Sequence, residues 1–281
     1  MIDLPVAQCA EELKEGAFFA VQLTRDGELS IDGRSASLDQ LSKSLEDRCE
    51  RHSVEVRRLG RPATEVVSAG RVGWTLPVVI RADKDALWAH VQYVHTVLIE
   101  QRLSRVYWAA HQCASASHTA EEVGQPRAER SIAKPPEHVV RAFMSIPPKE
   151  PRIDAIQQSV VRVRVVGRDF VRVERGPKGD PVGIQWPRSV TYEFAGQAAD
   201  DLLGVEQWLG RHRKQPVGDR ASVQVGEIVA TRILPFKYVV ALYDRYVRQG
   251  YSRIDYFEAL LPSPEERARR RLPVKEWGEA R

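Results

Sequence analysis

Long apolar runs are absent from the 281-residue sequence: no stretch of about eighteen uncharged apolar residues occurs, and the start, Met1 to Pro5, lacks the basic and apolar regions of a signal peptide. We expect neither a transmembrane helix nor an export signal in the chain as given. Cysteine is scarce, and Cys9, Cys49 and Cys113 form no CxxC pair, which excludes a redox motif and a zinc ribbon. An odd number of thiols suits a reducing compartment better, although a periplasm with little disulfide exchange would tolerate it.

Catalytic motifs are absent as well. The sequence has no G-x-S-x-G elbow, no G-x-x-x-x-G-K-[ST] phosphate loop and no H-E-x-x-H helix. Asp200 and Asp201 are adjacent, but we expect them in the first turn of a helix, where the helix dipole favours carboxylates. His111, Cys113 and His118 lie close together without a fourth ligand at fixed spacing. We therefore expect no enzyme, no metal and no cofactor; an enzyme with dispersed catalytic residues is the alternative.

The composition is that of a globular protein, with 43% hydrophobic and 28% charged residues. A net charge of +4, with both signs interleaved, argues against a nucleic-acid partner. The longest basic stretch, Arg267 to Arg271, is flanked by glutamates that dilute its field. The length suits two domains of ordinary size.

The first region reads as alternating strands and helices. Strands are expected at 16–24 and 28–32, joined by a turn at 25–27. Ser37 is placed as the N-cap of a helix that ends near residue 48. A buried central strand is predicted at 76–82.

The rest of the first region is a helix followed by a strand. Asp83 then stands where a helix begins, as an N-cap or a strand-end carboxylate. That helix is expected to end near residue 102. A last strand is expected at 105–109. From residue 112 to 158 the chain is rich in proline, which predicts a linker, interrupted by a short helix at 137–144.

The same order of elements recurs after the linker. The expected elements are strands at 160–166 and 170–174 around a turn at 167–169, a strand at 190–194, a helix with Leu202, Val205 and Leu209 on one face, a strand at 221–225, a helix at 235–249 and a strand at 254–257. The closing helix and strand of the two regions align without a gap at a separation of about 148 positions. This indicates an internal duplication; two unrelated α+β domains with a common layout are the alternative.

The predicted fold class is therefore α+β, with two tandem ββαβαβ domains. The predicted bounds are 1–111 and 159–261 for the domains, 112–158 for the linker and 262–281 for a charged tail. Each domain is expected to form a mixed sheet with two helices on one face, because a strand–helix–strand crossover pairs parallel strands.

Arg162, Arg164 and Arg172 alternate with valines, so the arginines should lie on one face of their strands and the valines in the core. Such a face can bind carboxylates, or it can simply be solvated.

Four motifs in the first region occur in an order that carries a resemblance. They are Ile2 to Pro5, the hairpin Leu23 to Gly33, Leu38 to Leu41, and Val79 to Asp85. Over about residues 1–110 the chain resembles the soluble periplasmic domain of the ExbD/TolR biopolymer transport family. The second region matches by layout only, because Val229 to Thr231 stands where the motif has Arg81 to Asp83.

The resemblance implies a non-enzymatic accessory or scaffold component of a transport complex driven by the proton motive force. Its implied partners are a proton-channel membrane subunit and an energy-transducing protein or peptidoglycan, and its implied place is the periplasmic face of the inner membrane. Asp83, Arg162, Arg164 and Arg172 are the candidate partner-binding residues.

Two further expectations follow from the resemblance. The family's anchoring helix, with its proton-carrying aspartate, is missing from the chain as given, so we expect either a truncated product or a chain that keeps only the docking role. Because family domains act as dimers, the two regions are expected to pair within one chain as a pseudo-twofold unit. The alternative is a freestanding interaction domain without a transport role.

Overall fold

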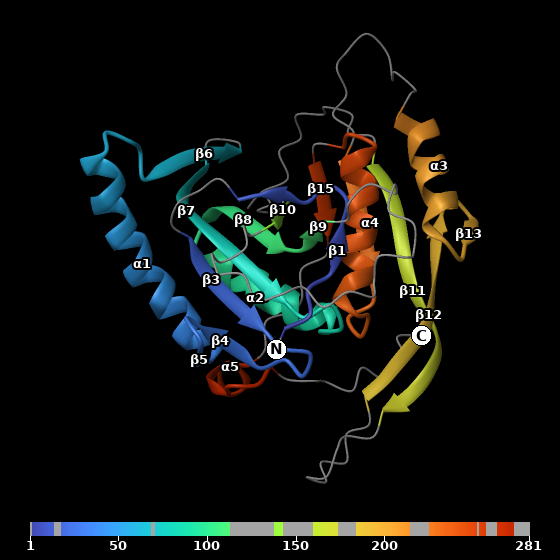
Figure 1. Cartoon of the computed structure of the whole chain (residues 1–281), viewed down its shortest axis with the longest axis horizontal. Coiled ribbons are helices and arrows are strands. Elements are labelled where there is room, and N and C mark those ends of the chain that lie inside the picture. Colours follow the sequence, from blue (N-terminus) through green and yellow to red (C-terminus); the bar gives the residue numbers. More distant parts are fainter. Residues whose placement is uncertain are drawn as a thin grey trace, which may run out of the picture.

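The computed structural model describes residues 2–13, 18–68, 71–112, 138–142, 160–173, 184–213, 225–251, 253–256 and 263–272 (Figure 1). These residues form two mixed β-sheets with helices packed against them. The α+β class predicted from the sequence is confirmed.

The larger sheet belongs mostly to the first region. Its strand order is β2 (Glu11–Glu12), β10 (His138–Ala142), β8 (Leu103–Ala109), β7 (Arg71–Ala82), β3 (Phe19–Leu23), β4 (Leu29–Ile31) and β5 (Arg34–Ser35), and β6 (Thr64–Ser68) pairs with β7. Strands β3, β7 and β8 are parallel, and β4 is antiparallel to β3. Its helices are α1 (Leu38–Arg58) and α2 (Trp88–Glu100).

The second sheet has five strands. Their order is β13 (Gln197–Ala199), β12 (Ile184–Phe194), β11 (Val160–Val173), β14 (Val225–Ala230) and β15 (Arg253–Tyr256). Its helices are α3 (Leu202–Arg213) and α4 (Phe236–Arg248). The chain also forms α5 (Pro264–Ala268) and a small sheet of β1 (Val6–Ala7) with β9 (His111–Gln112).

The two sheets share one topology. The path β5-β4-β3-β7-β8 in the first has the same order and the same strand directions as β13-β12-β11-β14-β15 in the second. The registers correspond too, because Ala20 pairs with Val79 where Arg162 pairs with Glu227. We call these two parts the first half and the second half. The common order is what a duplication would produce, but the duplication and the domain bounds remain predictions.

Local sequence explains the first hairpin and the first helix. Gly27 adopts φ +78°, which suits glycine, and the turn closes where the N–H of Thr24 donates to the carbonyl of Glu28 at 3.0 Å. Ser37 caps α1 in a reciprocal capping box with Gln40. The helix runs ten residues past the predicted end near residue 48. The prediction stopped early because the last turns carry few apolar residues and offer no periodic stripe.

Two predicted elements are wrong. The turn at 167–169 does not exist: β11 continues through it, and β12 pairs with both sides of it. Asp169 adopts φ +52° there, but the strand does not reverse. The helix at 137–144 is wrong because His138–Ala142 forms β10, whose backbone pairs with β8 and β2. Of the strand predicted at 221–225, residues 221–224 lie outside the described residues, and Val225 is the first described residue of β14.

One apolar core extends through both halves, between the inner faces of the sheets and the helices. A second, smaller core lies on the outer face of the first sheet. There Val79, Ala109 and Val139 are buried, and Leu4 and Phe18 are among the residues packed on them. The N-terminal segment 2–13 thus covers part of the face that the helices leave open.

Candidate functional site

The two halves meet where their closing helices begin. Leu87 and Pro235 form an antiparallel β-bridge there, and four backbone hydrogen bonds of 2.8–3.0 Å join the halves. They run from the N–H of Trp88 to the carbonyl of Leu234, from Phe236 to Ala86, from Ala89 to Arg232, and from Lys237 to Lys84. Each residue in one bond stands 148 positions from its counterpart in another bond. The junction therefore has the form of an approximate twofold interface.

The aromatic rings beneath this junction follow the same relation. Trp88 stacks on Phe236, its counterpart 148 positions later, with ring centroids 6.1 Å apart. Trp88 meets Tyr256 edge to face at 5.5 Å, and Phe236 meets Trp108 edge to face at 5.3 Å. Moving each residue by 148 positions turns one of these two contacts into the other, so the side chains repeat the symmetry of the backbone. Such pairs add to the free energy of burial by about 0.5–1.5 kcal/mol each.

His95 links the two halves from the inside of this cluster. It lies on α2 and is buried; Nε2 accepts a hydrogen bond from Nε1 of Trp108 at 2.6 Å, and Nδ1 lies 3.2 Å from the hydroxyl of Tyr256 on β15. Acceptance at Nε2 requires the proton of a neutral ring to be on Nδ1, which then donates to Tyr256. Burial lowers the pKa of His95 from 6.5 to about 3, so the ring is neutral at physiological pH.

Asp83 does not cap α2, so the N-cap role is wrong, and its carboxylate stands at the end of β7, which was the other expected role. The helix begins at Trp88 with Leu87 as N-cap and without a side-chain cap bond. The carboxylate of Asp83 instead accepts from the N–H of Asp85 at 3.0 Å, in a local turn, and from the N–H of Asp3 at 3.2 Å. Asp83 therefore holds the N-terminal segment against the end of β7.

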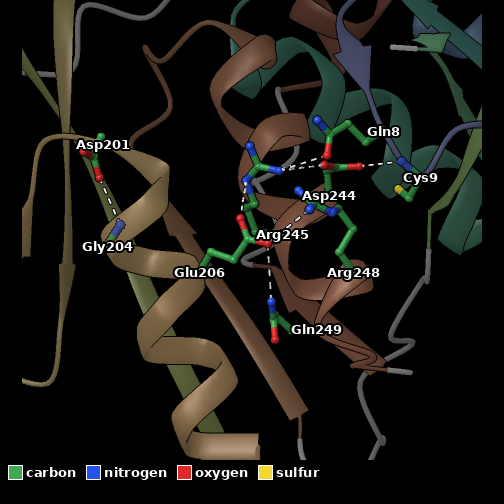
Figure 2. A network of polar contacts seen from close by, with 9 residues as sticks. All are labelled: Gln8, Cys9, Asp201, Gly204, Glu206, Asp244, Arg245, Arg248 and Gln249. Carbon is green, nitrogen blue, oxygen red and sulfur yellow. Dashed lines mark hydrogen bonds and ion pairs between the residues drawn. The ribbon is translucent and has the colours of Figure 1, made fainter. Parts of the chain in front are cut away.

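The N-terminal segment also reaches the second half. Figure 2 shows Asp244 of α4 beside Cys9: its buried carboxylate accepts from the backbone N–H of Cys9 at 2.7 Å. Arg245 donates to Gln8 at 3.4 Å and pairs with Glu206 of α3 at 3.6 Å. Burial, and then the Asp244 carboxylate, raise the pKa of the Cys9 thiol, so it is not a reactive thiolate.

The candidate arginines lie on the second sheet, on the face opposite its helices. Arg162 and Arg164 are exposed, while Val163 and Val165 are buried, as predicted. Arg162 forms an ion pair with Glu227 of β14, and Arg164 stands opposite Glu193 of β12. The Glu227 partner raises the pKa of Arg162.

The third candidate, Arg172, is placed only by its backbone. It pairs with Gln185 of β12, farther along β11, and its side chain lies outside the described residues. Asp83 belongs to the first half, so the structure does not bring the four candidates together in one site.

An open groove in the second half is the place where catalytic groups could converge. It is lined by Arg168, Asp169, Ser189, Val190, Thr191, Tyr192, Asp200, Asp201, Leu202 and Tyr238. Its carboxylates are engaged within the chain: Asp169 accepts from Ser189, Asp200 from Thr191, and Asp201 from the N–H of Gly204. Asp201 was expected in the first turn of a helix, but it precedes α3, which begins at Leu202.

Sequence reasoning missed Asp85, Lys237 and Asp244 as residues that join the parts of the molecule. Lys237 donates to Asp85 at 2.8 Å across the junction. The available signal was Asp244, a carboxylate one turn after Val240 on a helix face that is otherwise apolar.

Two negative findings apply to the described part of the chain. It contains no group of three or more His, Cys, Asp or Glu side chains placed to hold a metal ion. His111 lies in β9, and Cys113 and His118 are outside the described residues. None of the helices in that part is long and apolar enough to cross a membrane.

Comparison with known proteins locates the family relation in the first half. Residues 1–112 match the model of the family described as biopolymer transport protein ExbD/TolR. No curated protein and no solved structure matches the chain. The matched range holds the hairpin at Gly27, the capped helix α1, strand β7 with Asp83, and α2 with its junction residues. Residues 1–112 of this chain are therefore similar to the ExbD/TolR family.

Proposed function

We propose that the chain is a non-enzymatic docking component of an energy-transducing biopolymer transport complex, and that its two halves act together as a dimer within one chain. The family match of residues 1–112 supports the transport role. The observation that carries the paired arrangement is the set of four backbone hydrogen bonds between the halves. They form two pairs, and in each pair a shift of 148 positions turns one bond into the other.

The pairing is supported by the physics of symmetric interfaces. In a twofold interface each contact between residue i and residue j is matched by one between j and i. The two halves satisfy this rule in the backbone, at Trp88 and Phe236, and in the rings beneath. Such an arrangement presents two similar sheets to partners at a fixed angle, without a second copy of the chain.

The proposed partner surface is the outer face of the second sheet. Arg162 and Arg164 lie there on one regular strand, and a guanidinium binds carboxylates well. Carboxylates occur both in the peptides of peptidoglycan and on an energy-transducing protein. Arg172 extends the same strand, and Asp83 would act at the separate edge where the N-terminal segment crosses β7.

A docking role also fits the groove of the second half. Its hydroxyls and carboxylates are used to hold β12 and the start of α3 in place. Catalysis needs an acid or base that is free to reach a substrate. By the family relation, the partners would include a proton-channel membrane subunit, and the place would be the periplasmic face of the inner membrane.

The test is a charge reversal of the partner surface. The double variant Arg162→Glu/Arg164→Glu is compared with the natural chain in two arms. One arm measures binding to purified peptidoglycan sacculi, and the other measures capture of an energy-transducing protein by a photo-crosslinker at position 166. Binding by the variant should be at least about tenfold weaker. Loss in one arm only identifies the source of the carboxylates.

The matched control is Arg57→Glu/Arg58→Glu, which makes the same change in net charge at the exposed end of α1. It should leave binding unchanged. Equal loss in both double variants would mean that total charge, and not this surface, governs binding. No binding by the natural chain in either arm would contradict the docking role.

A further inference from the structure

The predicted charged tail is folded onto the first half. Arg271 donates two hydrogen bonds to one oxygen of Glu28, at 2.8 and 2.6 Å. Arg267 pairs with Asp39 at 3.2 Å and with Glu100 at 3.6 Å. Figure 1 shows α5 beside the start of α1 and beside β4 and β5, on the side of the molecule away from α3. Residues 263–272 therefore carry a contact from the end of the chain back to the family-related domain.

The contact includes backbone and apolar parts as well as charge. The N–H of Leu272 donates to the carbonyl of Gly27 at 3.1 Å, and Arg271 forms an antiparallel bridge with Glu28. The side chain of Leu272 is buried, with 2% of its surface exposed. A helical turn, two arginines four residues apart and a buried leucine thus fit one continuous surface of the first half.

We propose that this surface, formed by Gly27, Glu28, Asp39 and Glu100, is a docking site for arginine-bearing peptide segments, and that residues 263–272 occupy it as a displaceable mask. We call it the arginine-docking surface. The proposal concerns a site separate from Arg162 and Arg164, and it does not depend on the transport role.

The surface is selective for the positions of the arginines that form ion pairs with it. The segment has four arginines, and Arg267 and Arg271 engage the first half, while Arg269 and Arg270 are exposed. The spacing of the two arginines decides the fit, because total charge would not distinguish them. The acceptor is also fixed in place: a Cβ on Gly27 would lie 2.5 Å from the ring of His90, so the turn packs tightly on α2.

The mask is displaceable because the ion pair at its C-terminal end is exposed. About half of the side-chain surface of both Arg271 and Glu28 remains in solvent, 56% and 48% respectively. Pairs as exposed as these are weak and are screened by salt. The covalent tether adds to the backbone and apolar contacts of the segment, because it gives the segment a high effective concentration at the site. A second peptide with the same pattern can compete once it exceeds that concentration.

The experiment measures binding of a fluorescent peptide of residues 262–273 to the full chain by anisotropy. The variant Arg267→Glu/Arg271→Glu should release the mask and bind the peptide at least about tenfold more tightly than the natural chain. The matched control Arg269→Glu/Arg270→Glu makes the same charge change in the same segment, and it should stay masked like the natural chain. Adding Glu28→Lys and Asp39→Lys to the releasing variant should abolish binding.

A second measurement covers the case in which the releasing variant fails to fold. In the natural chain, a large excess of unlabelled peptide should speed hydrogen exchange of the Leu272 amide, which otherwise donates to Gly27. An unchanged exchange rate, failure of the folded releasing variant to bind, or release by the control variant would each overturn the proposal.

Discussion

Val79 of β7 and Glu227 of β14 occupy the same place in the two sheets. Each lies on the outer face, and they pair in register with β3 and β11 respectively. Val79 is fully buried beneath the N-terminal segment, in a small apolar core. Glu227 pairs with Arg162 and is 16% exposed. One strand order thus supports an apolar, covered face in the first half and a charged face in the second.

The inner faces show why both arrangements fold. Val21 pairs with Ile80 in the first half, and Val163 pairs with Ile228 in the second, and all four side chains lie in the shared core. Burial of this face stabilises the sheet by about 1.5–3 kcal/mol for each large apolar side chain. The outer face is left to vary with what covers it.

Exchanging the two residues should give the largest effect. Val79→Glu would place a charge without a partner in the small core, and we expect a loss of about 3 kcal/mol or more in the free energy of unfolding. Glu227→Val removes an ion pair whose arginine, Arg162, is 60% exposed and stays solvated, so it should change the free energy of unfolding by less than about 1 kcal/mol. Urea denaturation of both variants measures the difference; equal effects would show that the outer faces are not distinct.

His95 should make the junction sensitive to acid, with a smaller effect. Its folded pKa of about 3 is below the unfolded value of 6.5, so the unfolded chain takes up the proton more readily. The stability that neutral His95 contributes is therefore complete above pH 6.5 and is lost as the pH falls from 6.5 towards 3. Between pH 7 and 4.5 this amounts to about 2.5 kcal/mol.

The matched variant is His95→Gln, whose amide keeps a donor and an acceptor but does not titrate. Its free energy of unfolding should fall less between pH 7 and 4.5, by the amount given for His95. The counterpart of His95 in the second half is Tyr243, which does not gain a proton in acid. A pH profile that is identical in the natural chain and the variant would rule out His95 as the source.

The smallest expected effect compares Asp83 with its counterpart, Thr231. Asp83→Ala removes the acceptor for two backbone N–H groups and should lower the free energy of unfolding by about 1–2 kcal/mol. Thr231 is exposed, and Thr231→Ala should change it by less than about 0.5 kcal/mol. Thermal melts followed by circular dichroism would detect this, and a stable Asp83→Ala variant would argue that Asp83 is kept for a partner.

Most of the strand and helix order could be predicted because local patterns determine it. The glycine turn at Gly27, the capping serine Ser37 and the valine alternation on β11 each act within a few residues. The same patterns failed where distant parts decide the structure. His138–Ala142 has no strong local preference and becomes a strand because the edge of β8 supplies its hydrogen-bond partners.

The candidate site was predicted less well for a related reason. The alternation of Arg162 and Arg164 with valines predicted their exposure, but the ion pair of Arg162 with Glu227 depends on a strand more than sixty residues away. Asp83 was assigned to the nearest helix, whereas its acceptor role depends on the chain start at Asp3. The folding back of Arg267 and Arg271 had no periodic signal.

The bridge between Leu87 and Pro235 has a genetic consequence. In a dimer of identical chains, one codon change alters both sides of the interface at once. Here a codon change at Trp88 leaves Phe236 untouched, and a change at His95 leaves Tyr243 untouched. Each side of the junction can therefore be altered by mutation while the other keeps its original residue.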